Sequence, residues 1–297
     1  MKQKNNVAIV YAIIAAMLYA INIPLSKLLL KTVSATMMAA LLYLGAGIGL
    51  SSVFIVRKLC TTQKPGLRLT RKELPYTLGM IFLDIAAPIL LMLGLNGTTA
   101  ESASLLNNFE IVATSVIALV VFKELVSKRL WIAISLITLS SLILSLKDVT
   151  RLTFSFHSLF ILVACIAWGF ENNCTRMLSS KSTAEIVVLK GMFSGLGSLL
   201  IALALGEQFP PFSLLFECLL LGFFSYGLSI YFYILAQRYL GAAKTSAYYA
   251  VSPFLGVAFS FLLLHEVPNS NFLIALAVML IGTYFSVTDT IATQHTS

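Results

Sequence analysis

Residues 104–124 read SLLNNFEIVATSVIALVVFKE, a stretch that is apolar over most of its length and ends in Lys123 and Glu124. A helix that crosses the hydrocarbon core of a bilayer needs about 20 mostly apolar residues. Hydropathy therefore predicts a membrane-spanning helix around this stretch, and it predicts further helices of the same kind along the chain. The predicted spans cover residues 7–26, 33–56, 74–95, 99–122, 130–147, 155–175, 184–205, 213–237, 242–263 and 271–289.

The composition of the chain agrees with a protein built almost entirely of such spans. Of its 297 residues, 59% are hydrophobic and 11% are charged, and the mean hydropathy is +0.93. An ordinary globular domain is about 25% charged, so this chain cannot cover a soluble surface. Disordered and fibrous classes are excluded as well. The sequence predicts an all-α integral membrane protein with ten transmembrane helices and no additional soluble domain.

The formal net charge of +8 reflects membrane topology and gives no indication of nucleic-acid binding. Lysines and arginines lie in the short loops, where their bias sets orientation. With a cytoplasmic N-terminus, fifteen of the 20 fall on the cytoplasmic side, four lie opposite, and Lys190 is inside a span. We expect both termini in the cytoplasm, a location in the cell (inner) membrane, and contact between the basic loop Arg57–Lys72 and membrane lipids.

The two halves of the chain resemble each other in order, which indicates an internal repeat. LYAINIPLSK, residues 18–27, aligns without gaps with AWGFENNCTR, residues 167–176. Later in each half, VVFKE ends at Glu124 and FLLLHE ends at Glu266, each before a final span. Five spans per half would insert the second half in the opposite orientation, as in many secondary transporters. The predicted halves are residues 1–148 and 149–297.

Four segments carry a resemblance to a known family. They are SLLNNFEIVATSVIALVVFKE (104–124), WGFENNCTRMLS (168–179), LKGMFSG (189–195) and YGLSIYFYILAQRYLGAAKTSAYYAVSPFLGVAFSFLLLHE (226–266). In these the chain resembles the drug/metabolite transporter superfamily, in its ten-helix EamA branch. The resemblance implies two five-helix repeats, cytoplasmic termini and transport of small organic molecules, often as proton-coupled export. The substrate and the choice between monomer and homodimer stay open.

Asp84 is a charged residue in the middle of a predicted span, in the sequence FLDIAAPIL. Burying a charge in a bilayer is costly, so such a residue faces protein or water and usually has a role. Pro88 lies one helical turn later and leaves a backbone carbonyl unpaired. Asp84 is therefore either a functional carboxylate or a structural acid beside the proline kink.

Glu110 lies near the middle of the fourth span, one turn after Asn107 and Asn108. A spacing of three places Asn107 and Glu110 on one helix face. Desolvation favours the neutral form of a carboxyl group, which allows proton exchange near neutral pH, as a proton-coupled exporter requires. We expect Glu110 to be a proton-coupling or substrate-binding residue. The alternative is a glutamate paired with a buried base for packing.

Glu171 and Lys190 lie at similar depths on consecutive antiparallel spans, which predicts a buried ion pair between them. The pair has a structural or gating role, or it contacts substrate. Tyr19 and Trp168 correspond across the repeat, and both lie beside asparagines. A cavity lined by these aromatic rings, by amides and by one or two carboxylates would suit a zwitterion, an amine or a heteroaromatic metabolite. The cavity candidates are Tyr19, Asn22, Trp168, Glu171, Asn172 and Lys190.

Other functions remain as alternatives. A flippase for a lipid or lipid-linked precursor is compatible with the resemblance, whereas an intramembrane enzyme lacks an accompanying nucleophile, metal or phosphate motif. A channel would not need buried protonatable groups, and the chain contains no GxxxxGK[ST] motif for ATP. The cysteines and histidines show no metal-ligand spacing, so neither a metal nor another cofactor is expected. Contacts that close the ends of the helices are expected of Glu124 and Glu266.

Overall fold

The computed structural model describes residues 2–60, 69–122, 127–148, 153–178, 181–240, 245 and 248–293. Within these residues, nine helical segments are long and apolar enough to cross a membrane, as the hydropathy predicts. The remaining predicted span, 242–263, falls partly outside the described residues, and its described part overlaps the shorter apolar helix Ser252–Leu264. The α-helices are α1 (Lys2–Ala20), α2 (Asn22–Leu29), α3 (Ala35–Cys60), α4 (Leu74–Asn96), α5 (Ala100–Leu106), α6 (Phe109–Phe122), α7 (Lys128–Ser145), α8 (Phe156–Leu178), α9 (Thr183–Leu189), α10 (Gly195–Ala204), α11 (Phe212–Gly222), α12 (Ser229–Leu240), α14 (Ser252–Leu264) and α15 (Ser270–Thr293).

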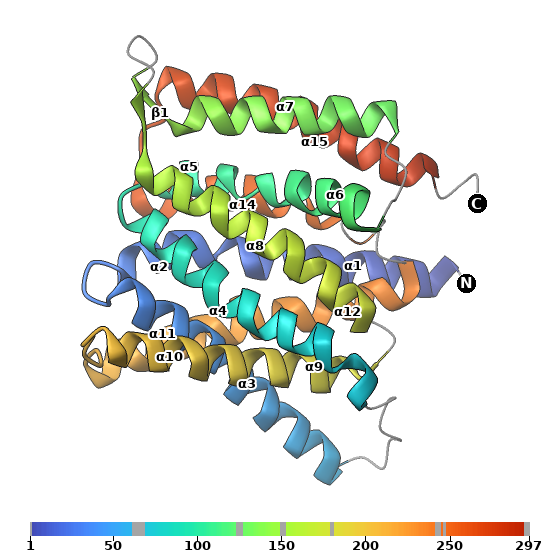
Figure 1. Ribbon diagram of the computed structural model, residues 1–297, viewed down its shortest axis with the longest axis vertical. Helices are drawn as coiled ribbons and strands as arrows, with labels where there is room; N and C mark the ends of the chain where they lie inside the picture. Colours follow the sequence, from blue (N-terminus) through green and yellow to red (C-terminus); the bar gives the residue numbers. More distant parts are fainter. Residues whose placement is uncertain are drawn as a thin grey trace.

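Shorter elements join or interrupt these helices. A 3₁₀ turn, η1 (Arg71–Glu73), precedes α4, and two π-helical segments, η2 (Lys190–Ser194) and η3 (Phe223–Leu228), lie inside spans. A small antiparallel pair, β1 (Leu146–Asp148) and β2 (Thr153–Phe154), connects α7 to α8. The start of α1 and the end of α15 lie at the same end of the bundle, and the β pair lies at the other (Figure 1).

The helices pack side by side in a bundle that is elongated across their axes (Figure 1). The pair α7 and α15 forms one end of this long dimension, where the Ser140 hydroxyl donates to the Ala275 carbonyl over 2.7 Å. At the other end, α3 packs against α10 and α11. Helices α1, α4, α8 and α12 lie between these ends, so the interior of the bundle is built by both halves of the chain.

The crossing of α3 and η2 requires two glycines. A Cβ at Gly191 would meet the backbone of Gly47, and a Cβ at Gly47 would meet the backbone of Gly191 and Met192. Small residues allow membrane helices to approach closely, because packing contacts replace the hydrophobic drive that water would supply. Lys190, which precedes Gly191, is thereby held deep inside the bundle.

Two predicted spans are broken near their middle. The span predicted at 7–26 is divided at Ile21, because Pro24 has no N–H to donate to the carbonyl of Ala20. The span predicted at 99–122 is divided at Asn107 and Asn108, where hydrogen bonds to the third preceding residue replace the regular α-helical pattern. The hydropathy pattern runs across both spans without interruption, so it did not predict either break. Broken helices are tolerated in membranes where the freed backbone is buried in protein or lines a cavity.

Candidate functional site

Three charged side chains meet in the interior of the bundle. Lys190 Nζ lies 2.9 Å from Glu171 Oε1 and 3.1 Å from Asp84 Oδ2, and all three side chains are at most 8% exposed. The expected pair of Glu171 and Lys190 is confirmed. The sequence did not predict that Asp84 would share the same ammonium group. We call Asp84, Glu171 and Lys190 the ionic triad.

The triad joins three spans and is fixed by further hydrogen bonds. Asp84 comes from α4, Glu171 from α8 and Lys190 from the start of η2, a type of local widening often found at functional sites. The Tyr43 hydroxyl donates to Asp84 Oδ1 over 2.7 Å, and the Thr175 hydroxyl donates to Glu171. Both oxygens of Asp84 thus bond to other helices and not to the kink at Pro88 in its own helix.

Glu110 lies outside this triad and has a different environment. Its Oε1 accepts a hydrogen bond of 2.6 Å from the side-chain amide of Asn172, on α8. The same amide is 3.4 Å from the Thr114 hydroxyl. Glu110 is partly exposed, whereas Asp84 and Glu171 are buried. The residue with the predicted coupling role is therefore a more accessible carboxylate near a closed ionic cluster.

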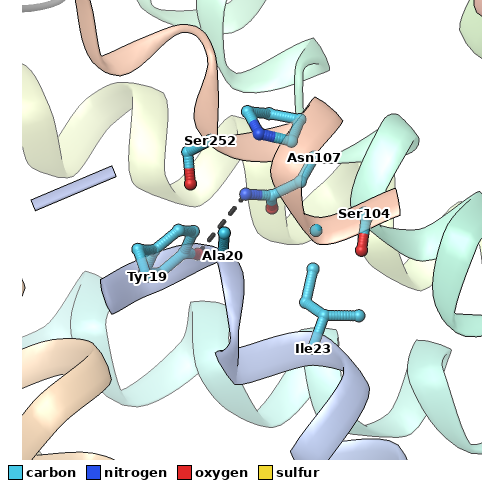
Figure 2. A pocket seen from close by; sticks show the side chains of 8 residues that line it. Tyr19, Ala20, Ile23, Ser104, Asn107 and Ser252 are labelled. Atoms are coloured by element: carbon cyan, nitrogen blue, oxygen red, sulfur yellow. Dashed lines mark hydrogen bonds between the residues drawn. The ribbon is translucent and has the colours of Figure 1, made fainter. Parts of the chain in front are cut away.

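A small cavity lies where broken spans meet. Its lining includes Tyr19 and Ala20 at the end of α1, Ser104 on α5, and Asn107 at the break that follows (Figure 2). The Asn107 amide donates to the Tyr19 hydroxyl over 3.3 Å. The cavity has room for about one water molecule. It joins polar groups from the first and fourth spans to the start of α14, where Ser252 also lines it.

At the break after α5, a thiol lies within hydrogen-bond range of two backbone carbonyl groups. Cys165 Sγ lies 3.7 Å from the carbonyl oxygens of Leu106 and Asn107, within the range of a weak S–H donor. Cys165 is buried. Asn108 is also buried, and its amide nitrogen has no hydrogen-bond partner among the residues that the structure describes.

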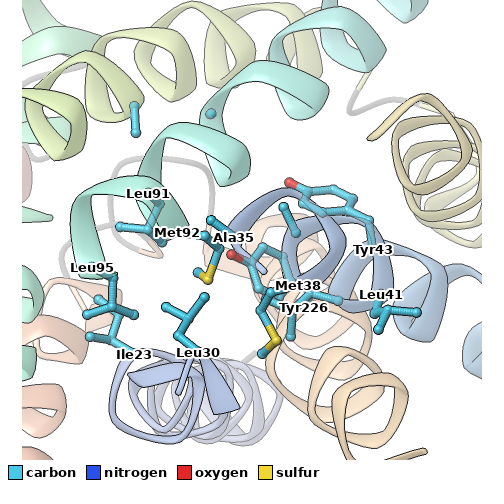
Figure 3. Packing of buried hydrophobic residues seen from close by; sticks show 14 of the residues in the cluster. Ile23, Leu30, Ala35, Met38, Leu41, Tyr43, Leu91, Met92, Leu95 and Tyr226 are labelled. Carbon is cyan, nitrogen blue, oxygen red and sulfur yellow. The ribbon is translucent and has the colours of Figure 1, made fainter. Parts of the chain in front are cut away.

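The remaining cavity candidates surround a row of tyrosines. The amide of Asn22 donates to the Tyr226 hydroxyl over 3.4 Å. The ring of Tyr226 lies 4.9 Å from that of Tyr43 and 5.8 Å from that of Tyr19, measured between centroids. Figure 3 shows Tyr43 and Tyr226 beside each other in the apolar core. Trp168 belongs to the same buried hydrophobic cluster as Tyr43 and Tyr226.

Two charged residues form hydrogen bonds to the backbone around the turn between α4 and α5. Lys27 Nζ donates to the carbonyls of Leu95 and Thr98 over 2.6 and 2.7 Å. Glu266 accepts from the backbone N–H of Ala100 and of Glu101 over 3.0 and 3.1 Å, at the start of α5. Burial raises the pKa of Glu266 above its ordinary value, although the Ala100 N–H and Lys27 oppose this shift.

These contacts agree with the closing role that was expected of Glu266. Glu124, which the sequence alignment of the two halves predicts to correspond to Glu266, lies outside the described residues. Two other residues of the candidate site, Tyr43 and Glu101, were not predicted from the sequence. A tyrosine in an apolar span gives no signal that distinguishes it from a packing residue. The acidic character of Glu101 was visible, but its position at the very start of a span made it resemble a loop residue.

Comparison with known proteins places this architecture in a family. The sequence model of the EamA-like transporter family matches residues 6–146 and 155–288. The chain belongs to the EamA-like transporter family. A relative from Methanothermobacter thermautotrophicus, described as an uncharacterized transporter, is 26% identical over 273 residues. That alignment covers 86% of this chain and 78% of the relative.

A solved crystal structure shares the fold of this EamA-like protein. The TM-score is 0.65, and the match covers 94% of this chain and 95% of the other. Sequence identity between the two is 14%, so the likeness concerns the fold alone. The family match and the apolar helices together make the protein a multi-pass membrane transporter that acts on a small molecule.

Proposed function

We propose that the protein is a secondary transporter that exports a small organic metabolite, of the amino acid or amine class, in exchange for protons. Transport would proceed by alternating access, with residues 1–148 and 149–297 as inverted halves that rock against each other. The positive-inside bias supports cytoplasmic termini in the cell membrane. The proposal extends to either a monomer or a homodimer.

The observation that carries the proposal is the contrast between Glu110 and the ionic triad. In the triad, the single ammonium group of Lys190 lies 2.9 and 3.1 Å from two buried carboxylates. Glu110 contacts the neutral amide of Asn172 and is partly exposed. A carboxylate with a neutral partner and access to the surroundings can alternate between holding a proton and holding a cationic group. A carboxylate locked in a buried ion pair cannot do so at comparable cost.

Glu110 and Asn172 come from different proposed halves, which supports a role in coupling. Relative motion of the halves would change the distance between this carboxylate and this amide. The broken spans near Tyr19 and Asn107 would supply the substrate-facing surface, as discontinuous helices do in other secondary transporters. Asn22, Asn108 and the neighbouring tyrosines would line the same route.

The test compares the metabolites that cells release when they express the parent protein, Glu110→Gln, or the control Glu217→Gln at equal membrane levels. Glu217 is a glutamate in a span whose side chain is exposed on the outside of the bundle. We expect compounds enriched outside cells with the parent and the control, and a loss of at least tenfold with Glu110→Gln. Equal release by parent and Glu110→Gln contradicts the coupling role.

Lipids are analysed in the same samples, because redistribution of a lipid in place of a soluble metabolite would favour the flippase alternative. Conversion of a compound into a new one, instead of its release unchanged, would favour an intramembrane enzyme. Neither alternative predicts a proton movement that accompanies release of an unmodified metabolite. Proton movement is followed in parallel with vesicles that contain a pH-sensitive dye.

A further inference from the structure

The span that begins with α5 contains three buried polar atoms that lack hydrogen-bond partners. Glu101 Oε2, Ser104 Oγ and Asn108 Nδ2 are each buried without a hydrogen-bond partner among the residues that the structure describes. Glu101 and Ser104 are three residues apart and lie on one side of α5, and Asn108 lies just beyond the end of α5, at the break in the span. Unpaired polar atoms are expensive to bury, so three in one span require a physical reason.

Glu101 is the outermost of these three residues under the proposed topology, and it is only 4% exposed. Nearby charged groups are engaged elsewhere. Glu266 binds the backbone N–H of Glu101, and Lys27 donates to the carbonyls before α5. His157, on α8, lies against Gly97 in the preceding turn. Among the described side chains, none forms an ion pair with the Glu101 carboxylate.

The other helices that pack against α5 bring no charge to this position. Within α4 the acidic residue is Asp84, which belongs to the ionic triad about halfway along the helix. Helix α7 has its charged residues, Lys128 and Arg129, at the opposite end of the bundle. Helix α15 has Asp289 near its C-terminal end. Glu101 is therefore a carboxyl group in a buried position without a compensating cation among these helices.

The middle one of the three residues connects Glu101 to the candidate site. Ser104 lines the small cavity together with Tyr19 and Asn107, and its hydroxyl is drawn there in Figure 2. A Cβ added at Gly256 would lie 2.9 Å from Ser104 Oγ and 3.4 Å from the Ala20 carbonyl oxygen, so both oxygens border the same space. The carbonyl of Ala20 has lost its usual helical donor because that position is Pro24.

We propose that Glu101 is a second proton-binding site, which exchanges protons between the outer side of the membrane and the cavity at Ser104. The inference rests on the proposed function, in which Glu110 is the inner coupling residue. Glu101 and Glu110 are nine residues apart on one span, and the break at Asn107 and Asn108 lies between them. The hydroxyl of Ser104 and the amides of Asn107 and Asn108 lie between them along the chain.

The proton balance of this route is simple. The Glu101 carboxylate takes a proton from water on the outer side and becomes a carboxylic acid, which is far less costly to bury than the ion. The acid then passes this proton through the cavity at Ser104 to the Glu110 carboxylate and returns to the carboxylate itself. Glu110 releases the proton to water on the cytoplasmic side when it binds the next cationic substrate, so each proton taken up outside is given up inside.

The experiment varies the pH of the purified protein without added substrate and records infrared difference spectra in the carboxylic-acid C=O region. The variants are Glu101→Gln, which keeps the backbone N–H that Glu266 binds, and the exposed control Glu217→Gln. We expect a titrating acid band in the parent and the control that is lost in Glu101→Gln, with one proton fewer bound per chain. An unchanged acid band and proton count in Glu101→Gln would overturn the proposal.

Glu101→Asp keeps the test informative even if the glutamine variant does not fold. It retains a carboxyl group, so the band should shift in frequency, and a band that does not move overturns the assignment. The spectra and the release assay fail separately. A Glu101 band together with equal release by parent and Glu110→Gln removes the proposed coupling role only. Glu110-dependent release without a Glu101 band removes the second proton site only.

Discussion

Replacing Lys190 by methionine tests whether the ionic triad stabilises the bundle. The substitution keeps an unbranched side chain but removes the ammonium group that contacts Glu171 at 2.9 Å and Asp84 at 3.1 Å. Two carboxylates would then remain buried and face each other without a cation. Breaking a buried pair typically costs about 3–5 kcal/mol, because the remaining charge loses its partner. Two stranded carboxylates place this variant at the upper part of that range, unless one of them binds a proton.

The measurement is the free energy of unfolding in mixed micelles for the parent, Lys190→Met, and the same change in a chain that also carries Asp84→Asn and Glu171→Gln. In this background Lys190 is itself a buried charge without a carboxylate partner, so Lys190→Met removes a stranded charge and should leave the free energy of unfolding unchanged or raise it. The difference between the two costs gives the coupling of the triad. Equal costs in both backgrounds would refute the reasoning, since they would show that packing alone explains the effect.

A charge swap between Glu171 and Lys190 does not test this ion pair in isolation. The swap would preserve one ion pair if these two residues were isolated. Asp84 shares the same ammonium group, so the swap would place a second carboxylate against Asp84. We therefore expect the swap to destabilise the protein even if the triad has no contact with substrate.

Three further predictions follow from single contacts. Tyr43→Phe removes the 2.7 Å hydrogen bond to Asp84 and should lower the unfolding free energy by about 1.5–3 kcal/mol, as measured in mixed micelles. Gly191→Val would collide with the backbone of Gly47, so the yield of folded protein in size-exclusion chromatography should fall sharply, whereas an equal yield would contradict the close crossing. Because the pKa of Glu266 is raised, the folded state keeps the Glu266 proton to higher pH than the unfolded state does. The free energy of unfolding, compared with that of Glu266→Gln, should therefore fall as pH rises through this pKa. A difference in unfolding free energy that does not change with pH would contradict the burial effect.

The large-scale architecture was predictable because the bilayer imposes one dominant requirement. A span must be apolar and about 20 residues long, and this pattern is written directly in the sequence. The pair of Glu171 and Lys190 was predictable for a related reason, because depth in the membrane follows from the distance to the span ends. Here the prediction needed only two consecutive helices and no knowledge of the bundle.

The rest of the site depended on packing between distant spans. Asp84 reaches Lys190 because α4 and η2 are neighbours, and sequence order does not give that adjacency. The breaks at Ile21 and at Asn107 were hidden because hydropathy averages over a window and ignores a missing backbone hydrogen bond. Pro24 gave a local signal for the first break, whereas the two asparagines at the second gave a weaker one.

The partners of Asp84 are made at different times during synthesis. Chains emerge from the N-terminus, so the Tyr43 hydroxyl is already present when α4 enters the membrane. Lys190 and Glu171 are made only after further spans have been completed. Tyr43 can thus hydrogen-bond to Asp84 during assembly, when α3 and α4 are already in the membrane. The ammonium group of Lys190 then binds to a pair of helices that has already formed. Loss of the tyrosine should accordingly reduce membrane insertion of the nascent chain, even under conditions where the finished protein tolerates it.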